Sequence, residues 1–175
     1  MPQFDASSAE CQLFTFKEGL LSAVAHDLEL SVRTFELQLE DDYSGLSARF
    51  DTRSIRVIDA IVDGRRSSSS LSAKDKTKIE SNVLKDVLPT KRGTEAVFAS
   101  TSITAVDAGW EIRGTLKLNG REKELAIPVF KNDGKVIGEV TLHQPDFGIK
   151  PYSAMLGALK IQPDVKVRVT CTLPE

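Results

Sequence analysis

Alternation of apolar and polar residues is the feature of this sequence that most constrains its fold. Trp110 and Ile112, and then Leu116 and Leu118, occupy even positions, with charged or small residues between them. A period of two residues is typical of a β-strand that buries one face. Runs of this kind recur along the chain and predict eight strands, near residues 11–17, 28–40, 44–58, 94–105, 109–118, 122–131, 135–143 and 158–172.

Turn signals and changes of phase say how these strands connect. Asn119-Gly120 and Asn132-Asp133-Gly134 predict tight turns that join three consecutive strands into a meander. Two of the predicted strands change phase midway, at Arg33-Thr34 and at Thr52-Arg53. One extra residue at each place would return the apolar residues to a common face, so we expect β-bulges there. Bulges bend strands as the wall of a barrel requires.

One segment, residues 72–88, has a helical pattern instead. Ser72 is a favourable N-cap, and Asp75 completes a capping-box pair with it. Apolar residues then recur on one helical stripe until Pro89 ends the helix. We expect a second, shorter helical turn over residues 18–25, where leucines and a valine cluster.

These elements predict a single all-β domain over residues 1–175. Its expected architecture is an eight-stranded antiparallel barrel with one longer helix and one short helical turn, because closure of the sheet removes exposed edges. The interior of an eight-stranded barrel holds either packed side chains or one small ligand. Small residues at inward positions, such as Ala48, Gly114 and Gly138, are compatible with a cavity, but the alternation leaves both interiors open.

Composition limits the classes of function. Apolar residues make up 41% of the chain and charged residues 27%, and no run approaches 18 apolar residues, so disordered and membrane-spanning chains are excluded. The formal net charge of −2 excludes a nucleic-acid partner. The N-terminus has no basic segment followed by an apolar one, so we expect a cytoplasmic protein, or a periplasmic one if a leader has been trimmed. Cys11 and Cys171 form no metal-binding motif and are expected to be free thiols, near each other if the first and last strands are neighbours.

Four segments together resemble the YceI-like family: LSAKDKTKIESNVLKDVLP at 71–89, GTLKLNGREKELAIPV at 114–129, PDFGIKPY at 145–152 and DVKVRV at 164–169. Their order and spacing extend the resemblance from about residue 11 to residue 173. The resemblance implies a lipocalin-like barrel that binds or carries a long-chain hydrophobic or amphiphilic ligand, isoprenoid or fatty-acid-like, without a cofactor. Because no segment is apolar enough to span a membrane and residues 64–92 are basic, we expect at most a peripheral contact with membranes, and a homodimer is left open.

Two groups of residues are predicted to contact such a ligand. Polar side chains at the mouth of the barrel would meet its headgroup, and apolar side chains of the strands and the helix would enclose its chain. The predicted polar set is His26, Arg65, Lys76 and Tyr152, and the predicted apolar set is Phe14, Phe16, Leu28, Leu30, Phe50, Ile79, Val83, Leu84, Val87, Phe98, Ile112, Leu116, Leu142 and Phe147.

Several of these features also have a purely structural interpretation. His26-Asp27 would contact a headgroup, ligate a metal with His143, or cap a strand; no third ligand has metal-like spacing, so no metal site is predicted. The segment from Gly64 to Arg92 carries a net charge of +5 against −7 for the rest, which forms either a collar for anionic headgroups or a solvated helix face. Residues 147–149, between two prolines, predict a rigid corner.

Two other functions compete with ligand binding. A filled barrel serving as an interaction or stress-response module predicts no internal void and an exposed apolar patch. An enzyme predicts buried titratable groups that converge inside the barrel, and the sequence contains no nucleophile motif, so no catalytic residue is expected.

Overall fold

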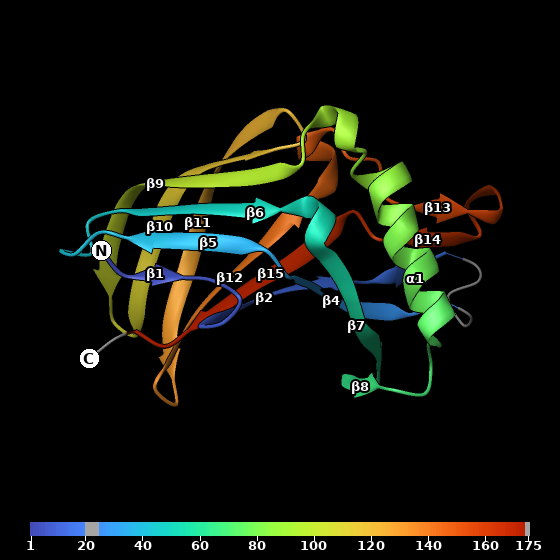
Figure 1. Cartoon of the computed structure of the whole chain (residues 1–175), viewed down its shortest axis with the longest axis horizontal. Helices are drawn as coiled ribbons and strands as arrows, with labels where there is room; N and C mark the ends of the chain where they lie inside the picture. The colour runs from blue at the N-terminus through green and yellow to red at the C-terminus, as the bar shows by residue number, and fades with distance from the viewer. Residues whose placement is uncertain (20–24, 174–175) are drawn as a thin grey trace.

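The computed structural model describes residues 1–19 and 25–173 and has an all-β, mostly antiparallel fold with one α-helix (Figure 1). Twelve strands form one sheet in the order β1-β5-β6-β9-β10-β11-β12-β15-β2-β4-β7-β8, and β13, β14 and β3 form a second. The strands are β1 (Gln3–Phe4), β2 (Ala9–Thr15), β3 (Lys17–Glu18), β4 (Asp27–Val32), β5 (Phe35–Leu39), β6 (Leu46–Asp51), β7 (Ile55–Val62), β8 (Arg65–Ser67), β9 (Glu95–Val106), β10 (Gly109–Leu118), β11 (Arg121–Asn132), β12 (Lys135–His143), β13 (Ser153–Ala154), β14 (Leu159–Ile161) and β15 (Asp164–Cys171).

The meander expected from the turn signals is confirmed. β10 pairs with β11 and β11 with β12, each through a two-residue turn. Asn119 and Gly120 have φ angles of 54° and 77°, the left-handed conformation that a tight hairpin turn of this kind requires. Asp133 and Gly134 repeat it at the next turn, with φ angles of 48° and 76°. Turn chemistry therefore sets the register of the central strands.

The two changes of phase mark corners of the chain. The expected strand 28–40 divides into β4 and β5, and the expected strand 44–58 divides into β6 and β7 around a 3₁₀ turn, η1 (Thr52–Ser54). The hydroxyl of Ser54 accepts the backbone N–H groups of Arg33 and Thr34 at 3.1 and 2.9 Å, so each corner braces the other. The positions of the corners are as predicted. The expectation of single-residue bulges is wrong, because Arg33 and Thr34 separate β4 from β5 and the whole turn η1 separates β6 from β7.

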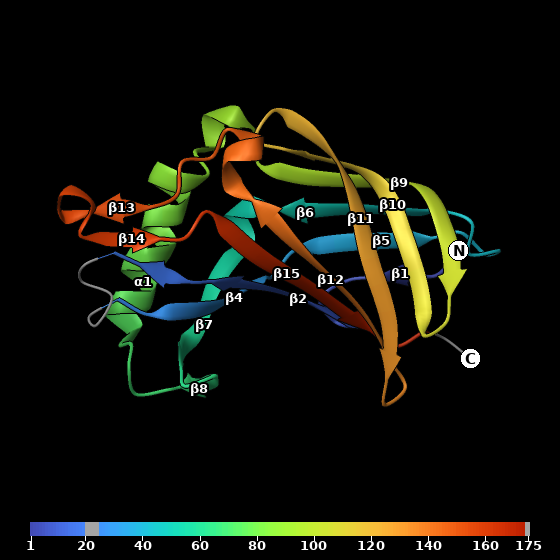
Figure 2. The ribbon, with the colours of Figure 1, turned by 180° about the vertical axis from the view of Figure 1, so that it is seen from behind.

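The closed eight-stranded barrel is not confirmed. The twelve-stranded sheet ends at β1 and β8, and the described residues form fifteen strands. The corners explain the difference: β5 pairs with β1 and β6, whereas β4, which precedes it in the chain, pairs with β2 and β7. Figures 1 and 2 show a sheet that curls around an interior, with the helix across the end opposite the two termini.

The helix is found where the sequence predicts it. α1 (Ala73–Asn82) begins after Ser72, whose side chain and that of Asp75 form the capping box, and it continues as a π-helical turn, η2 (Val83–Val87), that ends before Pro89. The expected helical turn at 18–25 is not confirmed at residue 18, which belongs to β3, and residues 20–24 lie outside the described residues.

α1 lies along β7 and completes its hydrogen bonding. β8 pairs only with residues 60–62 of β7, and earlier in that strand the Glu80 carboxylate accepts the backbone N–H of Val57 at 3.0 Å. Lys76 Nζ lies 3.0 Å from an Asp59 carboxylate oxygen on the same strand. The helix therefore covers the strand beyond the point at which its strand neighbour ends.

Replacing Ser72 by alanine is expected to lower the free energy of unfolding by about 1 kcal/mol, because the first turn of α1 loses its side-chain acceptor. Urea unfolding of the two proteins measures the difference. Ser69→Ala, an exposed loop substitution, serves as the control and should change the value by less than about 0.5 kcal/mol. Equal stabilities of Ser72→Ala and the control would contradict the capping role.

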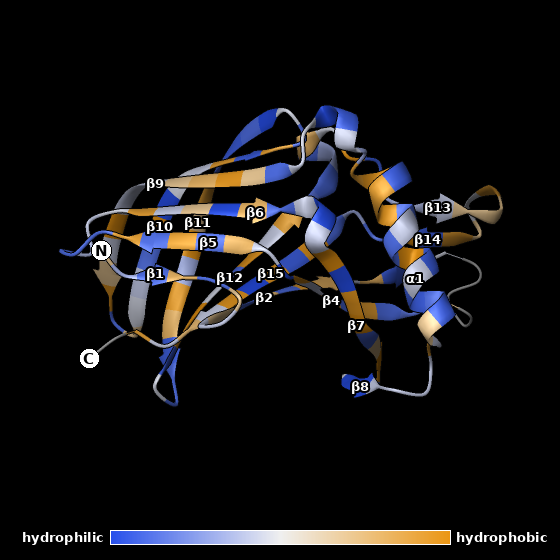
Figure 3. Cartoon of the chain, in the orientation of Figure 1, coloured by the Kyte–Doolittle hydropathy of each residue, from blue (hydrophilic) through white to orange (hydrophobic). Residues whose placement is uncertain are grey.

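Apolar and polar residues alternate along the strands (Figure 3). The buried cluster takes residues from both halves of each bent strand, including Leu30 and Val32 before one corner and Phe35 and Leu37 after it. The corner predicted at residues 147–149 lies at the end of a 3₁₀ turn, η4 (Gln144–Phe147), where Gly148 follows in the left-handed conformation. Its Phe147 carbonyl accepts the side-chain amide of Asn119, which fastens the corner to the β10–β11 turn.

Candidate ligand-binding cavity

Inside the curled sheet lie two neighbouring apolar chambers, which together form the candidate cavity. The larger has a volume of about 380 Å³ and the smaller about 190 Å³. Both are lined by four common residues, Phe50, Leu116, Leu142 and Val167, which mark the place where they meet. Side chains therefore do not fill the interior. An interaction module with a solid core would require a filled interior.

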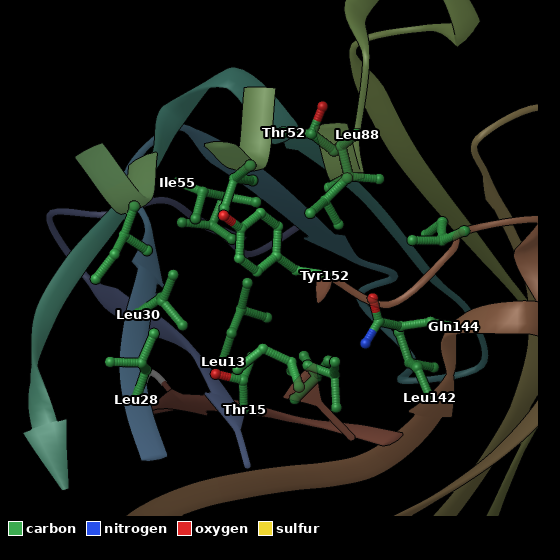
Figure 4. A pocket seen from close by; sticks show the side chains of 18 of the residues that line it. Leu13, Thr15, Leu28, Leu30, Thr52, Ile55, Leu88, Leu142, Gln144 and Tyr152 are labelled. Atoms are coloured by element: carbon green, nitrogen blue, oxygen red, sulfur yellow. The ribbon is translucent and has the colours of Figure 1, made fainter. Parts of the chain in front are cut away.

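The larger chamber lies at the end of the sheet that α1 covers. β2 and β4 form one wall, and the helix supplies Ile79, Val83 and Val87 from the opposite side. Leu159 and Ile161 of β14 close the remaining side. Figure 4 shows leucine and isoleucine side chains pointing into this space from several elements, with Tyr152 among them.

The smaller chamber extends under the central strands, where small residues leave room. Ala48 and Gly138 are among its lining residues, together with Phe98 and Ile112. Gly114 has a different role: a Cβ atom at this position would clash with the backbone carbonyl oxygen of Ala99 on β9 and lie 2.6 Å from Cζ of Phe98, so only glycine lets that strand and that ring approach β10 so closely. Two of the three small residues singled out in the sequence thus line the space, and the third seats an aromatic wall residue.

A few polar groups face the larger chamber. The amide of Asn82 donates to the Tyr152 hydroxyl at 3.2 Å, and Gln144 Nε2 donates to the carbonyl of Gln162, also at 3.2 Å. The Thr15 hydroxyl is buried and has no hydrogen-bonding partner among the described residues. The chamber wall therefore offers an unused hydroxyl at Thr15 and a tyrosine hydroxyl at Tyr152.

Most of the residues predicted to contact a ligand line this cavity. For those in strands and in the helical segment, the inward direction follows from alternation along the strand or from the helical stripe; His26, Phe147 and Tyr152 lie in turns and connections. The predicted residues that line the cavity are His26, Leu28, Leu30, Phe50, Ile79, Val83, Val87, Phe98, Ile112, Leu116, Leu142, Phe147 and Tyr152. Their contact with a ligand stays a prediction.

Two predicted aromatic residues lie elsewhere. Leu13 and Thr15 face the larger chamber, so Phe14 between them points to the outer face, where the Arg168 guanidinium lies 5.1 Å from its ring centre. Phe16 follows the end of β2 and is half-buried outside the lining. The prediction relied on apolar character at both positions and ignored the parity of the strand.

The predicted polar collar is also corrected. Arg65 is exposed on β8 and does not line the cavity, and Lys76 is held in its ion pair with Asp59. Leu84 follows Glu80 by one helical turn, on the side that meets β7, and it is absent from the lining. Arg66, which also belongs to the basic segment 64–92, forms an ion pair with Glu29. Glu29 is only 4% exposed and does not line the cavity.

The two histidines have separate surroundings. His26 lines the larger chamber, but the Asp27 carboxylate accepts the backbone N–H of Lys17 at 2.8 Å and thus has the local capping role. His143 lies at the exposed end of β12, with Nδ1 2.7 Å from the Asp164 carboxylate. Within residues 1–19 and 25–173, no three histidine, cysteine or acidic side chains gather as a metal site would require.

Sequence reasoning missed several lining residues. Val165 and Val167 of β15 face the cavity, and the alternation that marked their strand carried the signal for both. Thr15, Asn82 and Gln144 were missed because polar side chains on a predicted wall give no hydrophobic signal.

Cys11 and Cys171 lie on neighbouring strands, as expected if the first and last strands meet, and both are free thiols. Cys11 faces Val169, and Cys171 faces Ala9, so the two sit diagonally across the β2–β15 ladder. Burial raises the pKa of the Cys11 thiol to about 12 and also raises the pKa of Cys171.

Alkaline pH is expected to destabilise the protein through Cys11. Because its pKa is raised from 9.0 to about 12 in the folded state, the unfolded chain releases this proton first. The contribution is intact below about pH 9 and then declines by about 1.4 kcal/mol per pH unit until about pH 12. Urea unfolding should show that the free energy of unfolding of Cys11→Ala declines less steeply between about pH 9 and pH 12 than that of wild type. Cys171→Ala should keep the part of the decline that Cys11 causes. Identical slopes for wild type and Cys11→Ala would contradict this assignment.

The fold and the cavity together define an all-β protein with an internal apolar site. None of the described helices has the length and apolar character needed to cross a membrane. The YceI-like domain model matches residues 4–173, and the chain therefore belongs to the YceI-like family. No individually curated protein matches the sequence.

Solved structures share the fold at low sequence identity. BcnA of Burkholderia cenocepacia is 13% identical, with a TM-score of 0.61 over 96% of this chain and 99% of that one. A polyisoprenoid binding domain from Saccharophagus degradans, implicated in plant cell wall breakdown, is 10% identical, with a TM-score of 0.62 over 98% and 97%. The YceI protein of Campylobacter jejuni is 12% identical, with a TM-score of 0.55 over 86% and 88%.

Proposed function

We propose that this protein binds and carries one long-chain hydrophobic or amphiphilic molecule, isoprenoid or fatty-acid-like, inside the cavity. The observation that carries the proposal is a pair of neighbouring apolar chambers that share four lining residues, so that together they would suit a long and narrow ligand. The larger chamber alone falls within the range of about 300–1,000 Å³ that small-molecule sites occupy. The polyisoprenoid binding domain with the same fold supports this class of ligand.

The binding free energy would come from burying the chain. Each methylene group transferred from water contributes about 0.8 kcal/mol before ordering costs, so a chain that spans both chambers needs few polar contacts. The headgroup would remain at the α1 end of the larger chamber, where Thr15, His26 and Tyr152 face the space. The residues supply binding and orientation, and no chemical step is required of them.

Native mass spectrometry of gently purified protein tests the proposal directly. We expect an added mass that disappears on delipidation, together with displacement of a bound hydrophobic dye from the delipidated protein by long-chain fatty acids and isoprenols. Protein that carries no added mass and keeps its dye in the presence of both lipid classes would overturn the proposal and favour an interaction module.

A further inference from the structure

The tip of the β13–β14 hairpin exposes two large apolar side chains. The turn η5 (Met155–Gly157) places Met155 at 67% exposure and leaves Leu156 fully exposed. Other large apolar residues in the described part of the chain are less exposed, at 56% for Met1, 52% for Val106 and 46% or less for Tyr43, Val62 and Phe130. Met155 and Leu156 are adjacent, so this tip is the place where exposed apolar surface is concentrated.

The backbone of the tip is unfavourable as well. Met155 and Leu156 have φ angles of 54° and 56°, and Gly157 follows at 86°. Residues with bulky side chains rarely adopt this left-handed conformation, which glycine and asparagine adopt far more readily. Folding alone would favour glycine or asparagine at these positions, and a strained conformation at an exposed apolar site points to a function for the side chains.

The hairpin continues directly into the wall of the larger chamber. Leu159 and Ile161 of β14 line that chamber, as does Tyr152 just before β13. β14 also pairs with β3, so the tip is held on a small sheet (Figures 1 and 2). A molecule that moved along this hairpin from the tip to the cavity would meet the apolar side chains of Met155 and Leu156 first and those of Leu159 and Ile161 next.

The charges near the tip favour an anionic surface. Between Asp146 and Asp164 the chain carries Lys150 and Lys160 and no acidic residue. Both lysines are exposed, and Glu18, opposite Lys160 on β3, is the acidic residue that faces this segment in the ladder.

The size of the tip decides between a protein and a lipid partner. Two apolar side chains are far smaller than the roughly 800 Å² that each partner buries in a stable protein interface. An apolar tip beside the exposed Lys160, whose Cε would lie 3.2 Å from a Cβ atom on Gly157, instead suits a bilayer, because apolar groups enter the boundary of the acyl region while a lysine meets anionic headgroups.

We infer that the Met155–Leu156 tip docks the protein on an anionic lipid bilayer and that a ligand moves between bilayer and cavity along the β13–β14 hairpin. The second part rests on the proposed ligand-binding function, whereas the docking itself does not. Docking brings the chamber wall against the phase in which a long-chain ligand is dissolved.

Vesicle flotation of the full chain tests docking. The probes are vesicles of phosphatidylcholine alone and of phosphatidylcholine with phosphatidylglycerol. Met155→Asn/Leu156→Asn removes the apolar surface while keeping residues that tolerate the left-handed turn. We expect the variant to bind the anionic vesicles roughly tenfold or more weakly than wild type. Val106→Thr, a substitution of an exposed apolar residue at the C-terminal end of β9, should bind like wild type.

Three results would overturn the inference: wild type that does not float, equal flotation of wild type and the double variant, or flotation that ignores the anionic lipid. Size-exclusion chromatography provides a fourth such result. If wild type were a dimer and the double variant a monomer, the tip would contact a second copy of the chain and not a bilayer. Dye binding in detergent solution, without vesicles, examines the cavity separately. The double variant should keep wild-type dye affinity, and a loss there would assign the turn a role in shaping the chamber and overturn docking. Failure of wild type to bind dye would count against the proposed function alone.

Discussion

Tryptophan in place of Leu142 is expected to abolish tight binding of long-chain ligands while leaving short-chain binding almost unchanged. Leu142 lines both chambers, so a larger side chain there is expected to separate them. A long chain would then lose the smaller chamber. Excluding about five methylene groups costs about 4 kcal/mol, which raises the Kd by about a thousandfold.

Competition by a short and a long fatty acid against a bound dye measures this effect. Thr141→Trp is the matched control, because the neighbouring side chain on β12 is exposed and the same indole adds no bulk to the cavity. Leu142→Trp should lose affinity only for the long competitor, and Thr141→Trp for neither. Equal losses for short and long chains would show that a ligand does not extend through the junction.

Replacing Phe147 by alanine is expected to lower the free energy of unfolding by about 3–5 kcal/mol. Phe147 is 2% exposed, and it anchors the η4 corner whose carbonyl holds the Asn119 side chain. The void left by the ring joins the larger chamber that Phe147 lines, so neighbouring side chains cannot fill it by a small movement.

Urea unfolding of delipidated protein measures this loss, since a ligand that binds only the folded state would add to the stability of either protein. Phe130→Ala is the control, because Phe130 is exposed and lies outside both chambers; its substitution should cost less than about 1 kcal/mol. A similar small cost for Phe147→Ala would mean that the corner does not depend on its ring.

The alternation of residues was sufficient to predict which side chains face the interior, but not how the sheet is connected. Leu30 and Leu37 have opposite parity, and the sequence located the change between them correctly. Whether such a change is a bulge or a corner depends on the partner that each half finds. β4 and β5 find different partners, and those pairings join residues far apart in the chain, which local patterns do not encode.

The same reasoning explains the outcome at the cavity. Leu116 and Leu142 were predicted as lining residues because strand parity is a local property. Phe14 was placed wrongly because its aromatic character outweighed its parity, and the Arg168 that covers it comes from the last strand. The empty space itself has no local signal, since it results from the distances between elements that meet only in the folded molecule.

The hydrogen bond between Glu80 and Val57 couples two properties of the molecule. A helix that swung away to admit a ligand would leave the Val57 N–H, and the edge of β7 around it, free to accept a strand from another molecule. Opening this side would therefore invite self-association at the moment when the apolar interior is also uncovered. While α1 stays in place, the Glu80 carboxylate keeps this edge of β7 covered, and ligand entry through another part of the wall would leave that edge undisturbed.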